Sequence, residues 1–372
     1  MGLKIQNLTL KHFRAFRELH INGLGRVNLI TGKNNTGKSS VLEALHIFAH
    51  GAALDVISHV LERREGNIRV EGEGRTADRE RLIQISTLFY GFPEPSDFTE
   101  PIIISTKDNS CPMQLTIQVG WFSEERDSDG NLRLVPLQAD SFDEPDDVAA
   151  LVVETQNKKK RILALERLER YSYLSRISAP GSETQIPCIF VSPYDDRTTI
   201  LAPLWDKVSL TKFENHVVEA LQIIEPRISA VNMIYDENSN IGRKAIVRIE
   251  NIDRPIPLRL LGDGVNRLLD IALSLVNARG GILLIDEFEN GLHHTVQFDA
   301  WKTIFLLARE LDIQVFATSH SWDAVEAFQQ AAAETPEDGA LVRLTRRGEE
   351  IIPTVFSEDE LAIVTRNRIE VR

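Results

Sequence analysis

A glycine-bounded polar loop lies between an apolar strand pattern and an apolar helix pattern in LITGKNNTGKSSVLEAL, residues 29–45. The loop fits G-x-x-x-x-G-K-[ST], in which glycines let backbone N–H groups turn toward a bound anion. The positive end of the following helix adds to that attraction. We therefore predict a binding site for a nucleoside triphosphate, with Lys38 reaching the β- and γ-phosphates. The residues expected to contact the nucleotide are Gly32, Lys33, Asn34, Asn35, Thr36, Gly37, Lys38, Ser39 and Ser40.

Two adjacent carboxylates follow a second apolar strand pattern. In GGILLIDEF, four aliphatic residues, 282–285, stand directly before Asp286 and Glu287. A buried parallel strand ending there would put both carboxylates at the edge where α/β sheets bind ligands. We predict that Ser39 and Asp286 hold Mg²⁺ and that Glu287 is a catalytic residue that polarises the attacking water. An acidic strand end that only faces solvent is the ordinary alternative.

Two further patterns carry groups that suit phosphate chemistry. IQVFATSHS is an apolar strand pattern that ends at His320, which in its neutral form would hydrogen-bond the γ-phosphate or the attacking water. Gly262, Asp263 and Gly264 stand at the start of a predicted helix and offer a second anion-binding geometry. One nucleotide does not need both loops, so we expect this GDG segment to cap the nucleotide of a second copy. A strand-end histidine and a helix capped by Asp263 are the alternatives.

The surrounding patterns predict an α/β fold with a parallel core sheet around the phosphate loop. Residues 3–30 read as strands, and residues 101–137 form strand-like runs separated by turns, which indicates an antiparallel lobe. The charged segment 157–174 is predicted to be an amphipathic helix, residues 205–228 to be helical, and residues 232–251 to form a hairpin. The last third alternates helix and strand, as parallel sheets with crossover helices do.

The bulk properties limit the class of protein. A chain of 372 residues is large for one core, so we expect an N-terminal lobe (1–140), an insert with a helical arm and hairpin (141–254) and a C-terminal lobe (255–372). The net charge of −13 argues against non-specific coating of nucleic acid. We find no apolar run of membrane-spanning length and no secretion signal, and the two cysteines are far apart. A cytoplasmic protein without a membrane partner is expected.

The order of phosphate loop, GDG, IDE and SH resembles that of the ABC-type ATPases of the RecF, SMC and OLD group. The N-terminal LKHFRAF is similar to the opening of that group. The resemblance implies an α/β ABC-type ATPase head whose P-loop parallel core sheet carries an antiparallel β lobe and a helical lobe with a short arm. It also implies a homodimer, or a higher even-numbered oligomer, that sandwiches two ATP molecules.

The same resemblance assigns roles to single residues. Glu287 matches the catalytic base, His320 the switch histidine and residues 290–293 the D-loop that crosses the dimer interface. The GDG segment matches the signature contact, with Asp263 in place of the usual serine. Arg14 matches an arginine that approaches the nucleotide in relatives.

The resemblance favours an ATP-driven switch that controls a separate effector, a nuclease or a toxin, in phage defence or DNA maintenance, with DNA as an open contact. A nucleotide-gated scaffold that hydrolyses ATP slowly is one alternative, and a RecF-like DNA repair ATPase is another. A small-molecule kinase would leave the GDG and SH elements unexplained.

Overall fold

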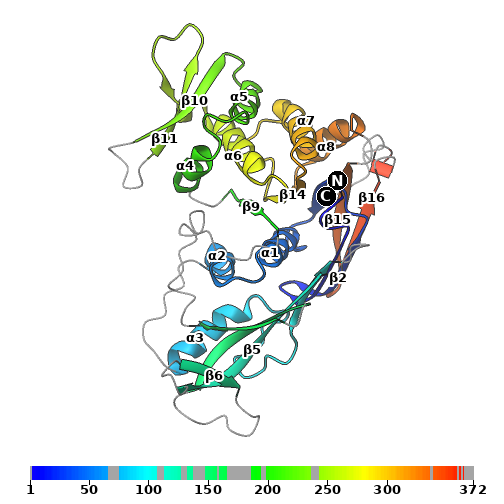
Figure 1. Ribbon diagram of the computed structural model, residues 1–372. Helices are drawn as coiled ribbons and strands as arrows, with labels where there is room; N and C mark the ends of the chain where they lie inside the picture. The colour runs from blue at the N-terminus through cyan, green and yellow to red at the C-terminus, as the bar shows by residue number, and fades with distance from the viewer. Residues whose placement is uncertain are drawn as a thin grey trace.

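The computed structural model describes residues 2–65, 75–106, 113–126, 132–136, 147–156, 159–165, 186–193, 198–235, 243–335, 338–357, 360, 361 and 363. Within these ranges the strands form a six-stranded core sheet, a seven-stranded sheet and a three-stranded sheet, with helices on both faces of the core (Figure 1). Within the same ranges, none of the helices combines the length and the apolar character that a bilayer crossing requires.

The core sheet has the order β16-β15-β3-β14-β13-β9. Its middle strands are parallel and their residues in β3, β13 and β14 are all buried, as expected of strands covered on both faces. This confirms the predicted parallel sheet with crossover helices. The strands are β3 (Val27–Gly32), β9 (Cys188–Val191), β13 (Ile282–Ile285), β14 (Gln314–Thr318), β15 (Gly339–Arg347) and β16 (Glu350–Phe356).

Side chains of these strands alternate between two hydrophobic clusters. Leu283 and Ile285 belong to one cluster, whereas Ile282 and Leu284 belong to the other. The first cluster lies under helices α4 (Thr198–Asp206), α5 (Glu214–Gln222), α6 (Asp263–Asn277), α7 (His294–Glu310) and α8 (Trp322–Ala333). The second includes α1 (Lys38–Ala49), α2 (Leu54–Glu65) and α3 (Arg75–Ser86).

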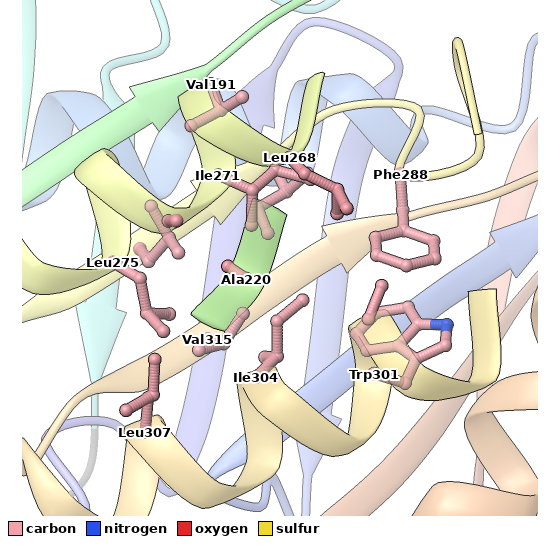
Figure 2. Close-up of a cluster of buried hydrophobic side chains, with 14 of the residues drawn as sticks. Val191, Ala220, Leu268, Ile271, Leu275, Phe288, Trp301, Ile304, Leu307 and Val315 are labelled. Carbon is pink, nitrogen blue, oxygen red and sulfur yellow. The ribbon is translucent and has the colours of Figure 1, made fainter. Parts of the chain in front are cut away.

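The first cluster supports the segment that follows β13. Figure 2 shows residues of α6 and α7 packed over the sheet, with Phe288 facing Trp301. The two rings are stacked with their centroids 3.9 Å apart. Because Phe288 directly follows Glu287, this stack fixes the backbone next to the predicted catalytic base.

The antiparallel lobe follows the order β2-β1-β4-β5-β7-β8, with β6 paired to β5. The prediction of an antiparallel sheet is confirmed, but the sheet continues past residue 140 and ends with β8. Its strands are β1 (Asn7–Phe13), β2 (Phe16–Asn22), β4 (Ile102–Thr106), β5 (Met113–Arg126), β6 (Leu132–Pro136), β7 (Asp147–Thr155) and β8 (Lys160–Ala164).

The helix predicted over residues 157–174 is wrong where the structure describes it. Lys160–Ala164 form β8, paired antiparallel to β7 from Glu154↔Lys160 to Ala150↔Ala164. The apolar spacing of this segment suits a helix, but the free edge of β7 offers backbone partners and an opposite charge across the pair. Tertiary pairing therefore outweighs local pattern here, and residues 166–174 lie outside the described residues.

The predicted helix over 205–228 and hairpin over 232–251 are partly found. Helices α4 and α5 cover only parts of the predicted helical range, because a turn in which Leu210 has a φ of 62° separates them and Ile228 already begins the first strand of the hairpin. The hairpin consists of β10 (Ile228–Tyr235) and β11 (Arg243–Ile249), with β12 (Ile256–Pro257) beside it. Its expected turn lies outside the described residues. Figure 1 shows this hairpin at the end of the molecule remote from β5 and β6.

Candidate active site

The phosphate loop connects the end of β3 to the start of α1. Gly32 and Gly37 have φ angles of 145° and 83°, which other residues rarely adopt. A Cβ at Gly32 would lie 2.5 Å from the Leu344 carbonyl oxygen, and one at Gly37 would lie 2.5 Å from the Phe16 ring. The glycines are therefore required by both backbone conformation and space.

Lys38 is held across this loop by main-chain oxygens. Its Nζ donates hydrogen bonds to the carbonyls of Gly32, at 2.8 Å, and Lys33, at 3.1 Å. Burial lowers the pKa of Lys38, while the nearby carboxylates of Asp286, Glu289 and Glu287 oppose that shift. An ammonium held this way is in position to exchange carbonyl partners for phosphate oxygens, which bind it more strongly.

Ser39 and Asp286, 247 positions apart in the chain, lie in contact. The Ser39 hydroxyl donates to Oδ1 of Asp286 at 2.9 Å, and the Thr318 hydroxyl at the end of β14 donates to the same oxygen at 2.6 Å. Asp286 is only 4% exposed. A hydroxyl and a carboxylate are hard oxygen ligands of the kind Mg²⁺ uses together with substrate phosphates. These residues fit a magnesium site, and the sequence alone did not indicate Thr318.

Glu287 occupies an unusual backbone conformation with a φ of 48°. Its N–H donates to Oγ1 of Thr318 at 2.9 Å, and buried Arg267 donates to the carbonyls of Asp286 and Glu287 at 2.8 and 3.0 Å. A left-handed conformation in a side-chain-bearing residue is costly and persists only where surrounding contacts hold it. These bonds hold the turn at which Glu287 departs from Asp286.

His320 lies beside Glu289 at the end of β14. Its Nδ1 is 3.1 Å from Oε1 of Glu289, which also accepts the His320 backbone N–H at 2.9 Å. When the neutral ring places its proton on Nδ1 for this carboxylate, Nε2 is left as an acceptor. An acceptor suits a water molecule better than a phosphate oxygen, so of the two roles considered for His320 the water contact fits best.

Arg14 is tied into the protein more firmly than the sequence indicates. Its side chain is 7% exposed, its Nε lies 3.2 Å from Oε2 of Glu43, and it donates to the carbonyl oxygen of Thr87 at 3.0 Å. Glu43, on α1, also accepts a hydrogen bond from Arg64 at 2.8 Å. Arg14 therefore has a structural partner at the site in addition to any contact with nucleotide.

Arg63 on α2 is a site residue that sequence reasoning missed. Its Nη2 lies 3.7 Å from Oδ2 of Asp286 and donates to the hydroxyl of Ser192, and its guanidinium lies 4.2 Å from the centroid of Phe190. In the sequence, Arg63 belongs to LERRE, a pattern typical of a solvated helix face. Only the packing of α2 against the end of β9 reveals it.

A cavity of about 760 Å³ brings Arg14, residues 34–40, Glu287 and His320 together, whereas Gly32, Lys33 and Asp286 are not among its described lining residues. Its volume is within the range of about 300–1,000 Å³ that small-molecule sites have. Its described lining residues are Arg14, Ala15, Asn34, Asn35, Thr36, Gly37, Lys38, Ser39, Ser40, Arg64, Thr87, Tyr90, Gly91, Phe92, Glu287, Thr318, Ser319, His320, Arg346 and Glu349.

The GDG segment is not among those lining residues. It begins α6, where Gly262 and Asp263 are exposed and a Cβ at Gly262 would meet nothing within 4 Å. A Cβ at Gly264 would lie 3.0 Å from the Gly291 carbonyl oxygen, so the GDG segment packs against the predicted D-loop. We call residues 262–264 and 290–293 together the signature face.

Comparison with known proteins finds a matching family and several similar chains. Residues 27–325 match the family described as "AAA domain, putative AbiEii toxin, Type IV TA system". An "ATP/GTP phosphatase" of Helicobacter pylori is 24% identical over 391 residues, covering 98% of each chain. A "DNA replication and repair protein RecF" of Clostridioides difficile is 37% identical over 49 residues, 13% of each chain. Among solved structures, an SMC head bound to the C-winged helix domain of ScpA covers 95% of this chain and 97% of that chain, with 13% identity and a TM-score of 0.48.

Proposed function

Because the chain belongs to the family described as "AAA domain, putative AbiEii toxin, Type IV TA system", we propose that it hydrolyses ATP with Mg²⁺ as a nucleotide-gated dimer. The chain is an ABC-type ATPase of the RecF and SMC group and has an α/β fold. The name of the Helicobacter pylori relative, whose match covers 98% of each chain, supports hydrolysis and leaves GTP as a second substrate.

The observation that carries this proposal is the contact of Ser39, Asp286 and Thr318 beside the phosphate loop. The loop N–H groups and Lys38 bind the phosphates. Ser39 and Asp286 would hold Mg²⁺, which would supply positive charge that offsets the charge of the triphosphate. Glu287 accepts a proton from the attacking water, and Nε2 of His320 orients that water.

The dimer is proposed from the position of the signature face. Gly262, Asp263 and Gly291 are exposed and are not among the described residues that line the cavity holding the phosphate loop. An exposed helix start attracts an anion from another molecule. A second copy placed head to tail would bring this helix start to the γ-phosphate and close each site.

The test of the proposal is a Glu287→Gln variant. We expect kcat to fall about 10²- to 10⁴-fold, the usual contribution of a general base. ATP should still bind, and the variant with MgATP should form a stable dimer in light-scattering measurements.

Glu326→Gln, an exposed position on α8, is the matched control and should behave as the wild type. Wild-type turnover in Glu287→Gln would overturn the assignment of the base. If the Glu287→Gln variant remains monomeric at micromolar concentration with MgATP, the proposed dimer is overturned.

We further propose that the cycle operates in the cytoplasm and controls a separate effector, a nuclease or a toxin, in phage defence or DNA maintenance. The family description, which names a toxin of a toxin–antitoxin system, supports control of a toxic activity. ATP turnover measured alone and with the product of the adjacent gene tests this. Unchanged turnover together with no complex between the two would contradict it.

A RecF-like role in DNA repair is the second candidate, favoured by the local similarity to RecF proteins. It predicts that DNA raises ATP turnover without another protein. A slow nucleotide-gated scaffold would instead form the dimer with ATP and show the same low turnover with DNA and with the neighbouring protein.

A further inference from the structure

Phe92 is an exposed aromatic side chain at the cavity that contains the phosphate loop. Its side chain is 64% exposed and its φ is 52°. An exposed phenylalanine and a left-handed non-glycine backbone are each unfavourable in isolation. Their coincidence at the rim of a ligand cavity points to a use for the ring.

The segment that carries Phe92 is fixed to the rest of the site. The backbone N–H of Arg14 donates a hydrogen bond to the carbonyl oxygen of Leu88 at 2.8 Å, and the backbone N–H of Tyr90 donates one to the carbonyl oxygen of His12 at 3.0 Å. Phe89 is buried and pairs with Phe13 of β1. These contacts attach residues 88–90 to the end of β1 and to Arg14 in the turn that follows it. Phe16, which begins β2 just after this turn, lies against Gly37 of the phosphate loop. Phe92 therefore stands on a positioned element.

The described lining residues of the cavity are of two chemical kinds. Lys38, Ser39, Glu287 and His320 carry polar or charged groups that suit phosphates and an attacking water. Tyr90 and Phe92 instead carry large aromatic rings. A nucleotide has a charged triphosphate and a flat aromatic base, so the aromatic part of the lining suits the base.

We propose that Phe92 stacks on the base of the bound nucleotide and makes the site selective for purine over pyrimidine nucleoside triphosphates. The inference rests on the proposed function in one respect, that the phosphate loop binds a nucleotide. A purine has the larger ring system and covers more of an exposed aromatic face, so it gains more from stacking. Stacking reads no particular edge of the base, so ATP and GTP are both accepted.

The test compares affinities for ATP, GTP, CTP, UTP and inorganic tripolyphosphate, each with Mg²⁺, by titration calorimetry. Phe92→Ala should weaken ATP and GTP binding about ten-fold, the loss expected of one stacking contact, and leave tripolyphosphate unchanged. In this variant, the difference in affinity between purine and pyrimidine nucleotides should become smaller. Phe92→Trp should restore purine affinity, and its fluorescence should change with ATP more than with tripolyphosphate.

Leu210→Ala is the matched control, because Leu210 is 97% exposed with a φ of 62° and does not line this cavity. It should bind every ligand as the wild type does. The inference is overturned if Phe92→Ala binds ATP as tightly as the wild type, or weakens tripolyphosphate equally.

Phe92→Ala can also be added to the Glu287→Gln protein. If the double variant dimerises more weakly but binds ATP with unchanged affinity, the inference is overturned, because Phe92 then belongs to the contact between the two copies. The proposed function fails separately, if the wild type binds neither tripolyphosphate nor ATP.

Discussion

The two faces expected to meet at a nucleotide are built differently. The phosphate face, residues 32–40 with Asp286 and Glu287, is connected by hydrogen bonds from α1, β13 and β14 within one chain. The signature face is exposed at Gly262 and Asp263, and it contacts its own chain where Gly264 approaches Gly291 and where Leu292 is buried in the first cluster. The difference indicates that binding of phosphate is prepared in one chain, whereas closure of the site depends on another molecule.

The largest effect that separates the faces is expected for Lys38→Ala. It removes the ammonium that would bind two phosphates, so ATP affinity should fall about a hundred-fold or more. Titration calorimetry measures the loss. Lys207→Ala is the control, because the side chain of Lys207 is exposed and does not line the cavity that holds the phosphate loop. Equal losses in both variants would contradict a phosphate face organised around Lys38.

Asp263→Arg tests the other face. It should abolish the ATP-dependent pairing of the Glu287→Gln protein and the turnover of the wild type, because a large side chain fills the helix start. ATP affinity of the single chain should stay the same. Light scattering and calorimetry measure the two properties, and Glu326→Arg on α8 is the control. Loss of ATP binding by Asp263→Arg would show that the faces are not separate.

Arg63→Met examines how far the phosphate face depends on its own charges. It removes a cation beside buried Asp286, so the free energy of unfolding should fall by about 3 kcal/mol without ligand. With MgATP the loss should be smaller, since magnesium replaces the missing positive charge. Chemical denaturation with and without MgATP measures both. Arg64→Met, whose side chain is 44% exposed, should cost less, and a ligand-independent loss at Arg63 would contradict the explanation.

The smallest effect is expected for Lys4→Met, which should change stability without affecting the phosphate face or the signature face. Burial raises the pKa of Asp312, but hydrogen bonds and charges from Lys4 and Arg26 lower it by a larger amount, so the net change in the pKa is a decrease. A depressed carboxyl pKa gives stability that is present above its ordinary value of about 4 and is lost as pH falls through the folded-state value. Lys4→Met should therefore reduce stability at pH 7 and show a smaller further loss on acidification.

Unfolding curves at pH 7 and pH 3 measure this, with exposed Lys207→Met as control. ATP affinity and pairing should not change. A selective effect of Lys4→Met on one face would break the comparison.

The sequence reveals those parts of the site that have local causes. The phosphate loop is dictated by two glycines and a strand–helix junction, and Asp286 by the four aliphatic residues before it. The sequence does not predict the roles of Thr318, Glu43 and Arg63, because these roles arise where elements that are distant in the chain meet at one edge of the sheet. The segment at Lys160–Ala164 is misjudged for the same reason, since its strand exists through pairing with β7.

The alternation along β13 has a consequence for the whole molecule. Ile282 and Leu284 belong to one hydrophobic cluster, and Leu283 and Ile285 belong to the other. Because β13 contributes to both, unfolding of either cluster should displace β13 and thereby destabilise the other cluster. Despite its length, the chain should melt in a single cooperative transition, with calorimetric and van't Hoff enthalpies in agreement.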